Sequence, residues 1–499
     1  MSLEVLSAPP AVRPIRRRTR RDPKPRYRPD VSDQLDIVHG CPALQVPKGH
    51  IARELKKLIA ELDLSKVDHR YSSLGRHGYD PRHVLGAWVL ASIQGLHHAT
   101  KVSEALKLDG ALRFIAGGHA ISAGVLKRFR ACSELFEDLL QQTLTLALRR
   151  GLLKLDELAV DSVRLRAHAS MGAVRTKARS EKRLEALNLV ERDRLTDEEQ
   201  RAHDEKVRKH EQAIFACAER QCTSVVVTNP GAALMKFPNG GYGPGQRVTV
   251  AAAGVKERFV VTALIDAATT DYGKLEAAVK RTRRALEQSG VPVGERLQFA
   301  ADAGYFCETD LVFAQSIRHD TDVLVPEPPQ HRNRGHSKGL FHRDCFHFAP
   351  DGLVTCPAGR PMLGPVKDGR GELRWAGQDC QSCPLRPSCT NGKQRILVVN
   401  PRFDEARTEM RTRMAQPGAR QRYNQRIATI EPVFSILEER MAYRRVSTRH
   451  ERNSRAEILL KLLAYNLVRL IKASARFFCV RLLLCEEPTV GWFLLPLNA

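Results

Sequence analysis

The chain has 499 residues, which is too long for one small domain, and 42% of them are hydrophobic, enough to build a core. Its 80 Lys and Arg residues exceed its 56 Asp and Glu residues, and the formal charge of +24 makes a polyanion such as DNA the expected partner. The first residues form no apolar segment, and charges and a proline interrupt the apolar tail at 476–497. We therefore expect neither a signal peptide nor a membrane span, and we expect a cytoplasmic, nucleoid-associated protein.

Residues 1–47 are rich in proline and arginine and contain few apolar residues. Such a segment cannot bury enough apolar surface to fold alone, so we expect a flexible basic arm. Its arginines include Arg16, Arg17 and Arg18, which can lie along DNA phosphates. The alternative interpretation is a tail that only improves solubility.

Residues 48–150 show apolar side chains three and four positions apart, the period of an α-helix. This pattern predicts an all-α domain. A Gly-Gly turn at 117–118 followed by a basic helix start at Lys127 and Arg128 would suit DNA binding by a helix-turn-helix. Helical bundles with other functions show the same pattern, so that alternative stays open.

Residues 151–327 change to a mixed pattern of strands and helices. A first short strand is predicted to end at or just after Asp161, and a charged helical hairpin at 180–221 is inserted behind it. Three strands are expected within 223–265. A helix, a strand bearing Asp302, a second helix and a short strand follow, so this part is expected to form a sheet flanked by helices.

Residues 328–420 form a cysteine-rich insertion. The two-residue gap between Cys380 and Cys383 lets both thiolates reach one tetrahedral ion, and four thiolates can close a structural zinc site. Cys345 or His347 could replace one ligand, and reduced cysteines without a metal are the alternative. The predicted zinc ligands are Cys356, Cys380, Cys383 and Cys389.

Residues 421–475 begin with Tyr-Asn-Gln-Arg-Ile-Ala-Thr-Ile-Glu. Tyr423 and Arg426 lie one helical turn apart and can hold a phosphate, whereas Glu431 can hold a metal ion. Pro432 disfavours the α conformation for the residue before it, so a helix is expected to start or kink there.

Arg444 and Arg445 follow this stretch and are expected to contact DNA. They precede the apolar sequence AEILLKLLAYNLVRLIKA, whose period predicts a helix packed under the catalytic layer. The tail at 476–499 receives no assignment.

Asp161, Asp302 and Glu431 together supply the three carboxylates that two-metal phosphoryl transfer requires. Asp266 and Asp271 are also acidic residues near a strand end. They rank below Asp302 because they lie in a turn. Asp161 and Asp302 could instead cap a turn or pair with a nearby arginine.

At these residues the chain resembles the DDE transposases of bacterial insertion sequences, in the group marked by a Tyr-Arg-Glu signature. The matching segments are AVDSVRLRAHAS, FAADAGYF and Tyr423-x2-Arg426-x4-Glu431-Pro-Val-Phe. The resemblance implies an RNase H-like α/β fold, with Asp161, Asp302 and Glu431 holding Mg²⁺ or Mn²⁺.

The resemblance also implies the reaction and the partners. We expect cleavage of double-stranded DNA at transposon ends, strand transfer into target DNA, and a homodimer in the synaptic complex. Family members often carry a lysine seven residues after the glutamate, where this chain has Glu438. Two alternatives therefore stay open: a DNA-binding protein derived from a transposase that no longer cuts, and an RNase H-like nuclease.

Overall fold

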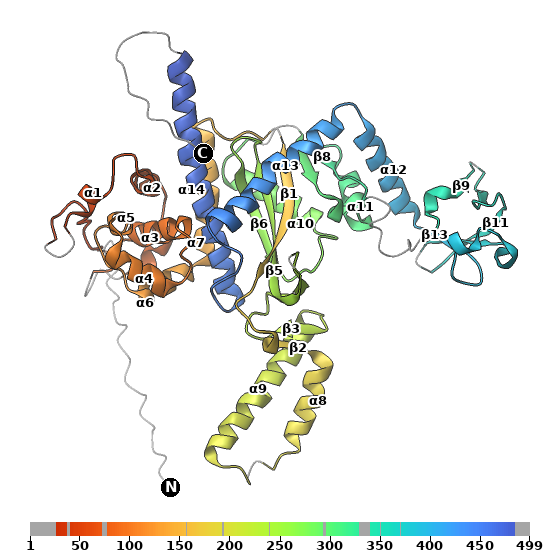
Figure 1. The fold of residues 1–499 in the computed structure, drawn as a ribbon, viewed down its shortest axis with the longest axis horizontal. Coiled ribbons are helices and arrows are strands. Elements are labelled where there is room, and N and C mark those ends of the chain that lie inside the picture. The colour runs from red at the N-terminus through yellow and green to blue at the C-terminus, as the bar shows by residue number, and fades with distance from the viewer. Residues whose placement is uncertain are drawn as a thin grey trace, which may run out of the picture.

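The structure is a computed structural model, and it describes most of the chain (Figure 1). Arg16, Arg17 and Arg18 of the predicted arm lie outside the described residues, as does the end of the predicted tail. The described ranges are 26–36, 40–71, 77–155, 157–191, 194–238, 240–292, 296–328, 340–349, 351–369 and 371–484, the last with side chains to 474.

Helices occupy the N-terminal part, drawn in orange in Figure 1, as its sequence period predicts. The third helix shows why they form where they do: Pro81 occupies its first turn, and the Asp80 side chain accepts a hydrogen bond from the Arg82 amide. Trp88 of this helix is fully buried. The helices are α1 (Pro42–Gln45), α2 (Ile51–Ala60), α3 (Pro81–Ile93), α4 (Ala99–Leu108), α5 (Gly110–Ile115), α6 (Ala123–Arg130) and α7 (Ser133–Arg149).

A mixed sheet lies at the centre of the molecule, and the expectation of a mixed α/β fold is confirmed. Five strands lie in the order β6-β5-β1-β7-β8, and β4 also pairs with β5. Strand β1 is antiparallel to β5 and parallel to β7, and β7 is parallel to β8. The strands are β1 (Leu158–Arg166), β4 (Ala233–Lys236), β5 (Tyr242–Ala253), β6 (Phe259–Asp266), β7 (Leu297–Ala301) and β8 (Thr321–Leu324), with α10 (Leu275–Gln288) and α11 (Glu308–Ser316) between the last three.

The first strand is longer than the sequence pattern predicts. It continues past Asp161 to Arg166 because β5 pairs with it along its whole length, from Leu158 opposite Ala253 to Arg166 opposite Gly245. Backbone pairing by a long neighbour therefore decides where this strand ends. Another predicted strand is also placed differently, because β3 (Ser224–Val226) pairs with β2 (Val174–Thr176) in a separate two-stranded sheet.

Two segments project from this central body (Figure 1). The charged hairpin consists of α8 (Lys177–Asn188) and α9 (Asp197–Glu219), and α9 begins with a capping box between Thr196 and Glu199. The cysteine-rich segment forms small sheets around a separate core that contains Trp375. Its strands are β9 (His347–Phe348), β10 (Val354–Thr355), β11 (Met362–Lys367), β12 (Leu373–Gly377) and β13 (Ile396–Val399).

The helix that follows this segment contains Pro432 in its interior. After α12 (Pro401–Ala415), α13 runs over Ala419–Ser435, so it does not start at Pro432. Proline lacks the amide that would bond the carbonyl four residues earlier, which is that of Ala428. The Arg258 side chain supplies the missing donor, with its Nε 2.8 Å from the Ala428 oxygen.

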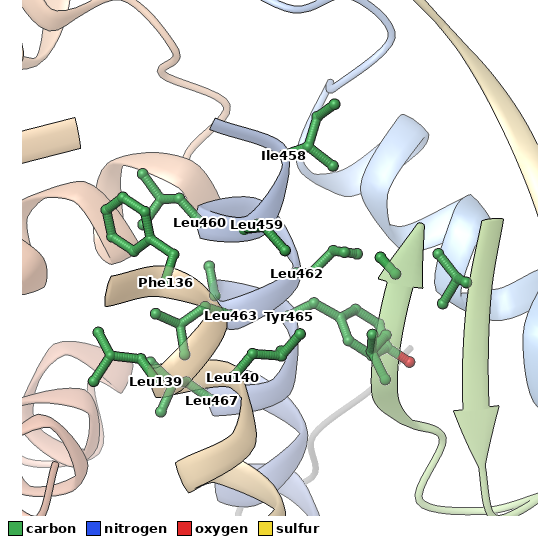
Figure 2. Close-up of a cluster of buried hydrophobic side chains, with 14 of the residues drawn as sticks. Phe136, Leu139, Leu140, Ile458, Leu459, Leu460, Leu462, Leu463, Tyr465 and Leu467 are labelled. Atoms are coloured by element: carbon green, nitrogen blue, oxygen red, sulfur yellow. The ribbon is translucent and has the colours of Figure 1, made fainter. Parts of the chain in front are cut away.

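The last helix, α14 (Glu451–Leu484), covers the predicted apolar sequence and passes between α7 and the sheet. Figure 2 shows Leu460 and Leu463 directed toward Phe136 and Leu140 of α7, and Tyr465 directed toward the strands. The Tyr465 hydroxyl donates to the Arg258 carbonyl oxygen at 3.0 Å. No helix within the described ranges combines the length and the apolar content needed to cross a membrane.

Candidate active site

One large cavity opens beside the middle of β1 and has a volume of about 460 Å³. It gathers side chains from β1, β5, the segments after β6 and β7, and the end of the α13 region. Four of its lining residues are acidic and four are arginines. The charged lining residues are Asp161, Asp271, Asp302, Glu438, Arg164, Arg166, Arg247 and Arg444.

Asp161 of β1 faces Arg426 of α13. The Arg426 Nη1 lies 2.7 Å from the Asp161 Oδ2, and Arg426 is buried, with 8% of its surface exposed. Burial, and then the nearby carboxylate of Asp302, raise the pKa of Asp161 to about 6, although Arg426 opposes this shift. Asp161 is therefore a carboxyl group whose surroundings, taken together, disfavour its negative charge.

Asp302 follows β7 directly and caps a short turn, accepting a hydrogen bond from the Gly304 amide at 2.7 Å. Burial, with a contribution from Asp271, raises the pKa of Asp302, while the Gly304 amide lowers it. A Cβ atom at Gly304 would lie only 2.8 Å from the Asp302 Oδ1 and 3.3 Å from the Asp271 Oδ2. Glycine at this position therefore lets the two carboxylates approach the same point.

Asp271 enters the cavity from the loop between β6 and α10, although its position in a turn ranked it below Asp302. Buried Arg247 of β5 forms an ion pair with the Asp271 carboxylate, and the Ser162 hydroxyl donates to the same oxygen. The Arg247 Nη1 also lies 2.6 Å from the Ser162 Oγ. Asp271 is thus neutralised by a buried arginine, a role that its sequence position alone does not reveal.

Glu431 does not lie in this cavity. Its side chain is exposed to solvent on α13 and is not among the lining residues, so the structure does not bring it together with Asp161 and Asp302. Glu438, seven residues later, lines the cavity instead. The role predicted for Glu431 stays a prediction.

Two family models match the chain. A model described as "Transposase DDE domain" matches residues 355–471, and a model described as "Transposase domain (DUF772)" matches residues 43–132. Together these two matches support a DDE transposase of the insertion-element type. The DDE domain implies an enzyme that acts on DNA, and this family generally uses divalent metal ions. No curated protein sequence matches the chain.

The acidic cavity of the transposase has the donor chemistry that such ions prefer, because Mg²⁺ and Mn²⁺ bind carboxylate oxygens. The carboxylate of Asp302 raises the cost of ionising Asp161, a cost that a bound cation would remove. Arg426 Nε is a buried nitrogen with no acceptor among the described residues. As arranged, no three acidic, histidine or cysteine side chains in the described part of the chain are close enough to hold one ion.

The described residues that are predicted to contact DNA occupy two regions of the chain. Arg444 lines the acidic cavity and pairs with Glu439 at 2.6 Å, and its neighbour Arg445 is exposed. The ring of Tyr423, on α13, lies 5.7 Å from the guanidinium carbon of Arg426. Tyr423 and Arg426 thus place a guanidinium group beside an aromatic ring.

The second region is on the N-terminal helices of the transposase. Lys127 and Arg128 are exposed on α6, and Arg128 lines a hollow of about 520 Å³. Arg28 and Arg70 line the same hollow, as does Tyr79, whose ring centre lies 4.2 Å from the Arg28 guanidinium carbon. Guanidinium groups beside an aromatic ring suit nucleic acid.

The four predicted zinc ligands of the transposase surround one small cavity in the cysteine-rich segment. Burial raises the pKa of Cys389, and the nearby thiols of Cys380, Cys356 and Cys383 raise it further. Cys345 and His347 do not line this cavity, so the structure gives no support to their substitution for a ligand. The cavity is lined by Cys356, Cys380, Cys383 and Cys389, among others.

Proposed function

We propose that this transposase cuts DNA at the ends of its element and joins the freed ends to target DNA. The observation that carries the proposal is the 460 Å³ cavity, in which Asp161 and Asp302 lie beside arginines able to bind phosphate. Family membership supplies the class of reaction. The cavity supports the proposal that this reaction takes place beside Asp161 and Asp302.

The catalytic domain is proposed to have an RNase H-like fold. Numbered along the chain, its five main strands lie in the order 3-2-1-4-5, since the sheet reads β6-β5-β1-β7-β8. The first three are antiparallel and the last two run parallel to the first. This strand arrangement supports the proposed RNase H-like fold. We also propose that the domains of the chain are divided after residues 47, 150, 327, 420 and 475.

The reaction needs two displacements at phosphorus. A water oxygen attacks the phosphate at the transposon end, the bond to the 3′ oxygen breaks, and a free 3′-hydroxyl remains on the element. That hydroxyl then attacks a target phosphate and displaces the 3′ oxygen of the target strand. Bound Mg²⁺ or Mn²⁺ would lower the pKa of the attacking group and neutralise the charge that develops on the phosphate.

The chain's own residues would position these groups. Asp161 and Asp302 would hold the ions, and Arg426 would orient Asp161 through its 2.7 Å contact. Arg164 and Arg166, which line the cavity, would bind phosphate oxygens on either side of the reacting one. Because these groups are fixed by β1 and α13, they need little rearrangement during the reaction.

DNA would reach the cavity along basic surfaces. Tyr423 is proposed to contact the transposon end, together with exposed Arg444 and Arg445. The hollow beside Lys127 and Arg128 is proposed as a second contact, supported by the arginines and tyrosines that line it. Two ends must be joined in one event, so a homodimer is proposed for the complex with DNA.

A second candidate function is DNA binding without cleavage. It is favoured by the exposed position of Glu431 and by the carboxylate at 438, where related transposases often have a lysine. Such a protein would bind transposon ends and leave them intact.

The test is incubation of the purified full chain with a labelled duplex from the end of its own element, with Mg²⁺, with Mn²⁺ or with EDTA. A nick at the repeat boundary that requires metal supports the transposase reaction. Replacement of Asp302 by Asn should abolish the nick while the gel-shift affinity for the duplex stays unchanged. Specific binding without a nick would support the second candidate.

The cysteine-rich segment is proposed to bind one structural Zn²⁺ through Cys356, Cys380, Cys383 and Cys389. The four thiols surround one cavity, which supports the proposal, and their side chains would have to rotate to complete a tetrahedral site. The ion would stabilise a segment whose own core is small.

A further inference from the structure

The charged hairpin formed by α8 and α9 projects from the central body and has no part in the reaction proposed above (Figure 1). Several of its charges are neutralised within the hairpin itself. The Lys177 Nζ lies 3.8 Å from the Glu181 Oε1, and the Lys209 Nζ lies 2.6 Å from the Glu205 Oε1. Ion pairs between residues four positions apart stabilise an exposed helix, so these charges have a structural explanation.

A stripe of three arginines on the same hairpin lacks such partners. Arg175, Arg179 and Arg183 follow one another at four-residue intervals from β2 into α8, and they are called the arginine stripe below. Arg179 and Arg183 are exposed and form no ion pair or hydrogen bond with any described residue. Among the described residues, Arg175 donates only to the backbone carbonyls of Gly172 and Val174.

The arginine stripe is concentrated near one imidazole. Burial, and then the positive charges of Arg175, Arg183 and Arg179, lower the pKa of His210 on α9. The three guanidinium groups therefore lie on one side of the hairpin. Like charges four residues apart destabilise a helix. A positive cluster that the hairpin does not neutralise therefore suits an anionic partner.

Further arginines extend from the catalytic cavity past the end of β1. The Val446 amide donates to the carbonyl oxygen of Arg166, a residue that lines the cavity, at 2.8 Å. Arg445 and Arg449 are exposed on either side of Val446, and neither forms an ion pair with a described residue. Burial, and then these two arginines, lower the pKa of His168, which follows β1. The positive charge of the cavity therefore continues along segment 444–449.

The same segment is attached to the base of the hairpin. The His450 amide donates to the Thr228 carbonyl oxygen at 3.0 Å, and the Glu451 Oε2 lies 2.6 Å from the Nη2 of Arg220 at the end of α9. Strand β3, which precedes Thr228, pairs with β2, the strand that carries Arg175. A duplex that leaves the cavity along this segment would therefore meet the hairpin next.

We propose that the hairpin binds backbone phosphates of duplex DNA outside the catalytic cavity, through the arginine stripe. The inference goes beyond the proposed function, which gives the hairpin no role, and it rests on that function for the identity of the polyanion. Guanidinium groups match phosphate oxygens in geometry and charge. Phosphate contacts carry no sequence information, so the hairpin strengthens the binding of any sequence in that position.

The test measures binding of the full chain to an end duplex, and to a scrambled duplex of equal length, by fluorescence anisotropy over a range of salt concentrations. Arg179→Gln/Arg183→Gln removes two charges from exposed positions. We expect it to weaken binding to both duplexes at least about tenfold at about 0.1 M salt, and to lower the slope of log affinity against log salt by about 2. Arg179→Lys/Arg183→Lys keeps the charges and should keep most of the slope.

Lys177→Gln/Lys209→Gln is the matched control, because it removes the same charge from lysines that pair with glutamates on the same hairpin. Its slope should stay within about 0.5 of the wild-type value. Equal melting temperatures would show that the variants fold. An unchanged slope in Arg179→Gln/Arg183→Gln would overturn the inference. An equal loss in the lysine variant would also overturn it, because net charge alone would then explain the effect.

Metal-dependent nicking of the end duplex separates this inference from the proposed function. If the wild type nicks the duplex and Arg179→Gln/Arg183→Gln binds as tightly as the wild type, the inference is overturned and the proposed function stands. If the wild type binds without nicking while the same variant loses affinity, the inference stands and the proposed function fails. A wild-type chain that binds no DNA would overturn both.

Discussion

Arg426 and Asp161 come from segments 265 residues apart and meet through a 2.7 Å contact between the Nη1 and Oδ2 atoms. Arg426 is the only charged partner of Asp161 among the described residues. It lies on α13, the helix that also leads to Glu438. A carboxylate that is buried beside Asp302 is thereby kept in one orientation at the edge of the cavity.

Replacement of Arg426 should therefore damage catalysis more than DNA binding. We expect Arg426→Gln to lower the rate of metal-dependent nicking about 100-fold, because Asp161 loses the group that orients it. Arg426→Lys should recover little activity, because an ammonium group lacks the planar fork of donors. Single-turnover cleavage of an end duplex measures the rate.

Arg402 provides the control for this experiment, because it is an exposed arginine on α12. Arg402→Gln should cleave like the wild type. A nicking rate unchanged in Arg426→Gln would show that Asp161 needs no orienting partner.

Asn466 should be a major determinant of stability. Its buried amide accepts from the Val260 amide at 2.9 Å, donates to the Val260 carbonyl at 2.8 Å, and donates to the Thr143 hydroxyl at 2.9 Å. It thus joins α14 to β6 and α7. Asn466→Leu should lower the free energy of unfolding by about 2–4 kcal/mol, because buried backbone groups of Val260 lose their partners.

Urea denaturation followed by circular dichroism measures this change. Exposed Asn424 on α13 serves for comparison, and Asn424→Ala should alter the free energy of unfolding by less than about 0.5 kcal/mol. Equal stabilities of the two variants would contradict the bridging role of Asn466.

Lys461 should make the stability of the protein depend on pH. It is fully buried on α14, and burial lowers its pKa from 10.5 to about 7, although Glu457 opposes the shift. The unfolded chain then binds more protons between pH 7 and 10.5, so the contribution of Lys461 to stability improves as pH rises through that window. Below pH 7 the full cost of a buried charge remains.

Lys461→Met should therefore raise the melting temperature most at pH 7 and below, and the gain should vanish above pH 10.5. Its neighbour Ser92 keeps a partner, because its hydroxyl donates to the Trp88 carbonyl at 2.6 Å. Thermal melts across this range measure the effect. Exposed Lys101 is the comparison, and a gain in Lys461→Met that is constant with pH would contradict the shifted pKa.

The proposed zinc ion should be removable without unfolding the central sheet, because the cysteine-rich segment has a core of its own. The chain as purified should contain one zinc per molecule by elemental analysis. Cys383→Ser should lose it and make residues 340–399 sensitive to trypsin. Cys345→Ser should keep the metal, because exposed Cys345 lies outside the cavity. A zinc content near zero in the wild type would contradict the proposal.

Patterns that depend on near neighbours in the chain were predictable from the sequence. The apolar period of AEILLKLLAYNLVRLIKA indicates a buried helix, and α14 is buried between α7 and the sheet. Asp161 and Asp302 could be singled out because each follows or lies within a short apolar run, and strands of one sheet bring such residues together.

Features that depend on contacts between distant segments were not predictable. The sequence shows where β1 begins, but its end at Arg166 depends on the pairing with β5. Asp271 lies in the cavity in an ion pair with Arg247 of β5. A turn residue and a strand residue separated in sequence carry no signal of this pairing.

The sequence by itself determined the family of this protein, its positive charge, its helical N-terminal part and the two aspartates of its cavity. The tertiary structure alone decided which glutamate faces them. A glutamate on an amphipathic helix can be recognised from the sequence period. The direction of its side chain depends on which face of the helix packs against the sheet. Burial of Ile430 and Val433 and the π-helical turn after Ser435 turn Glu431 outward and Glu438 inward.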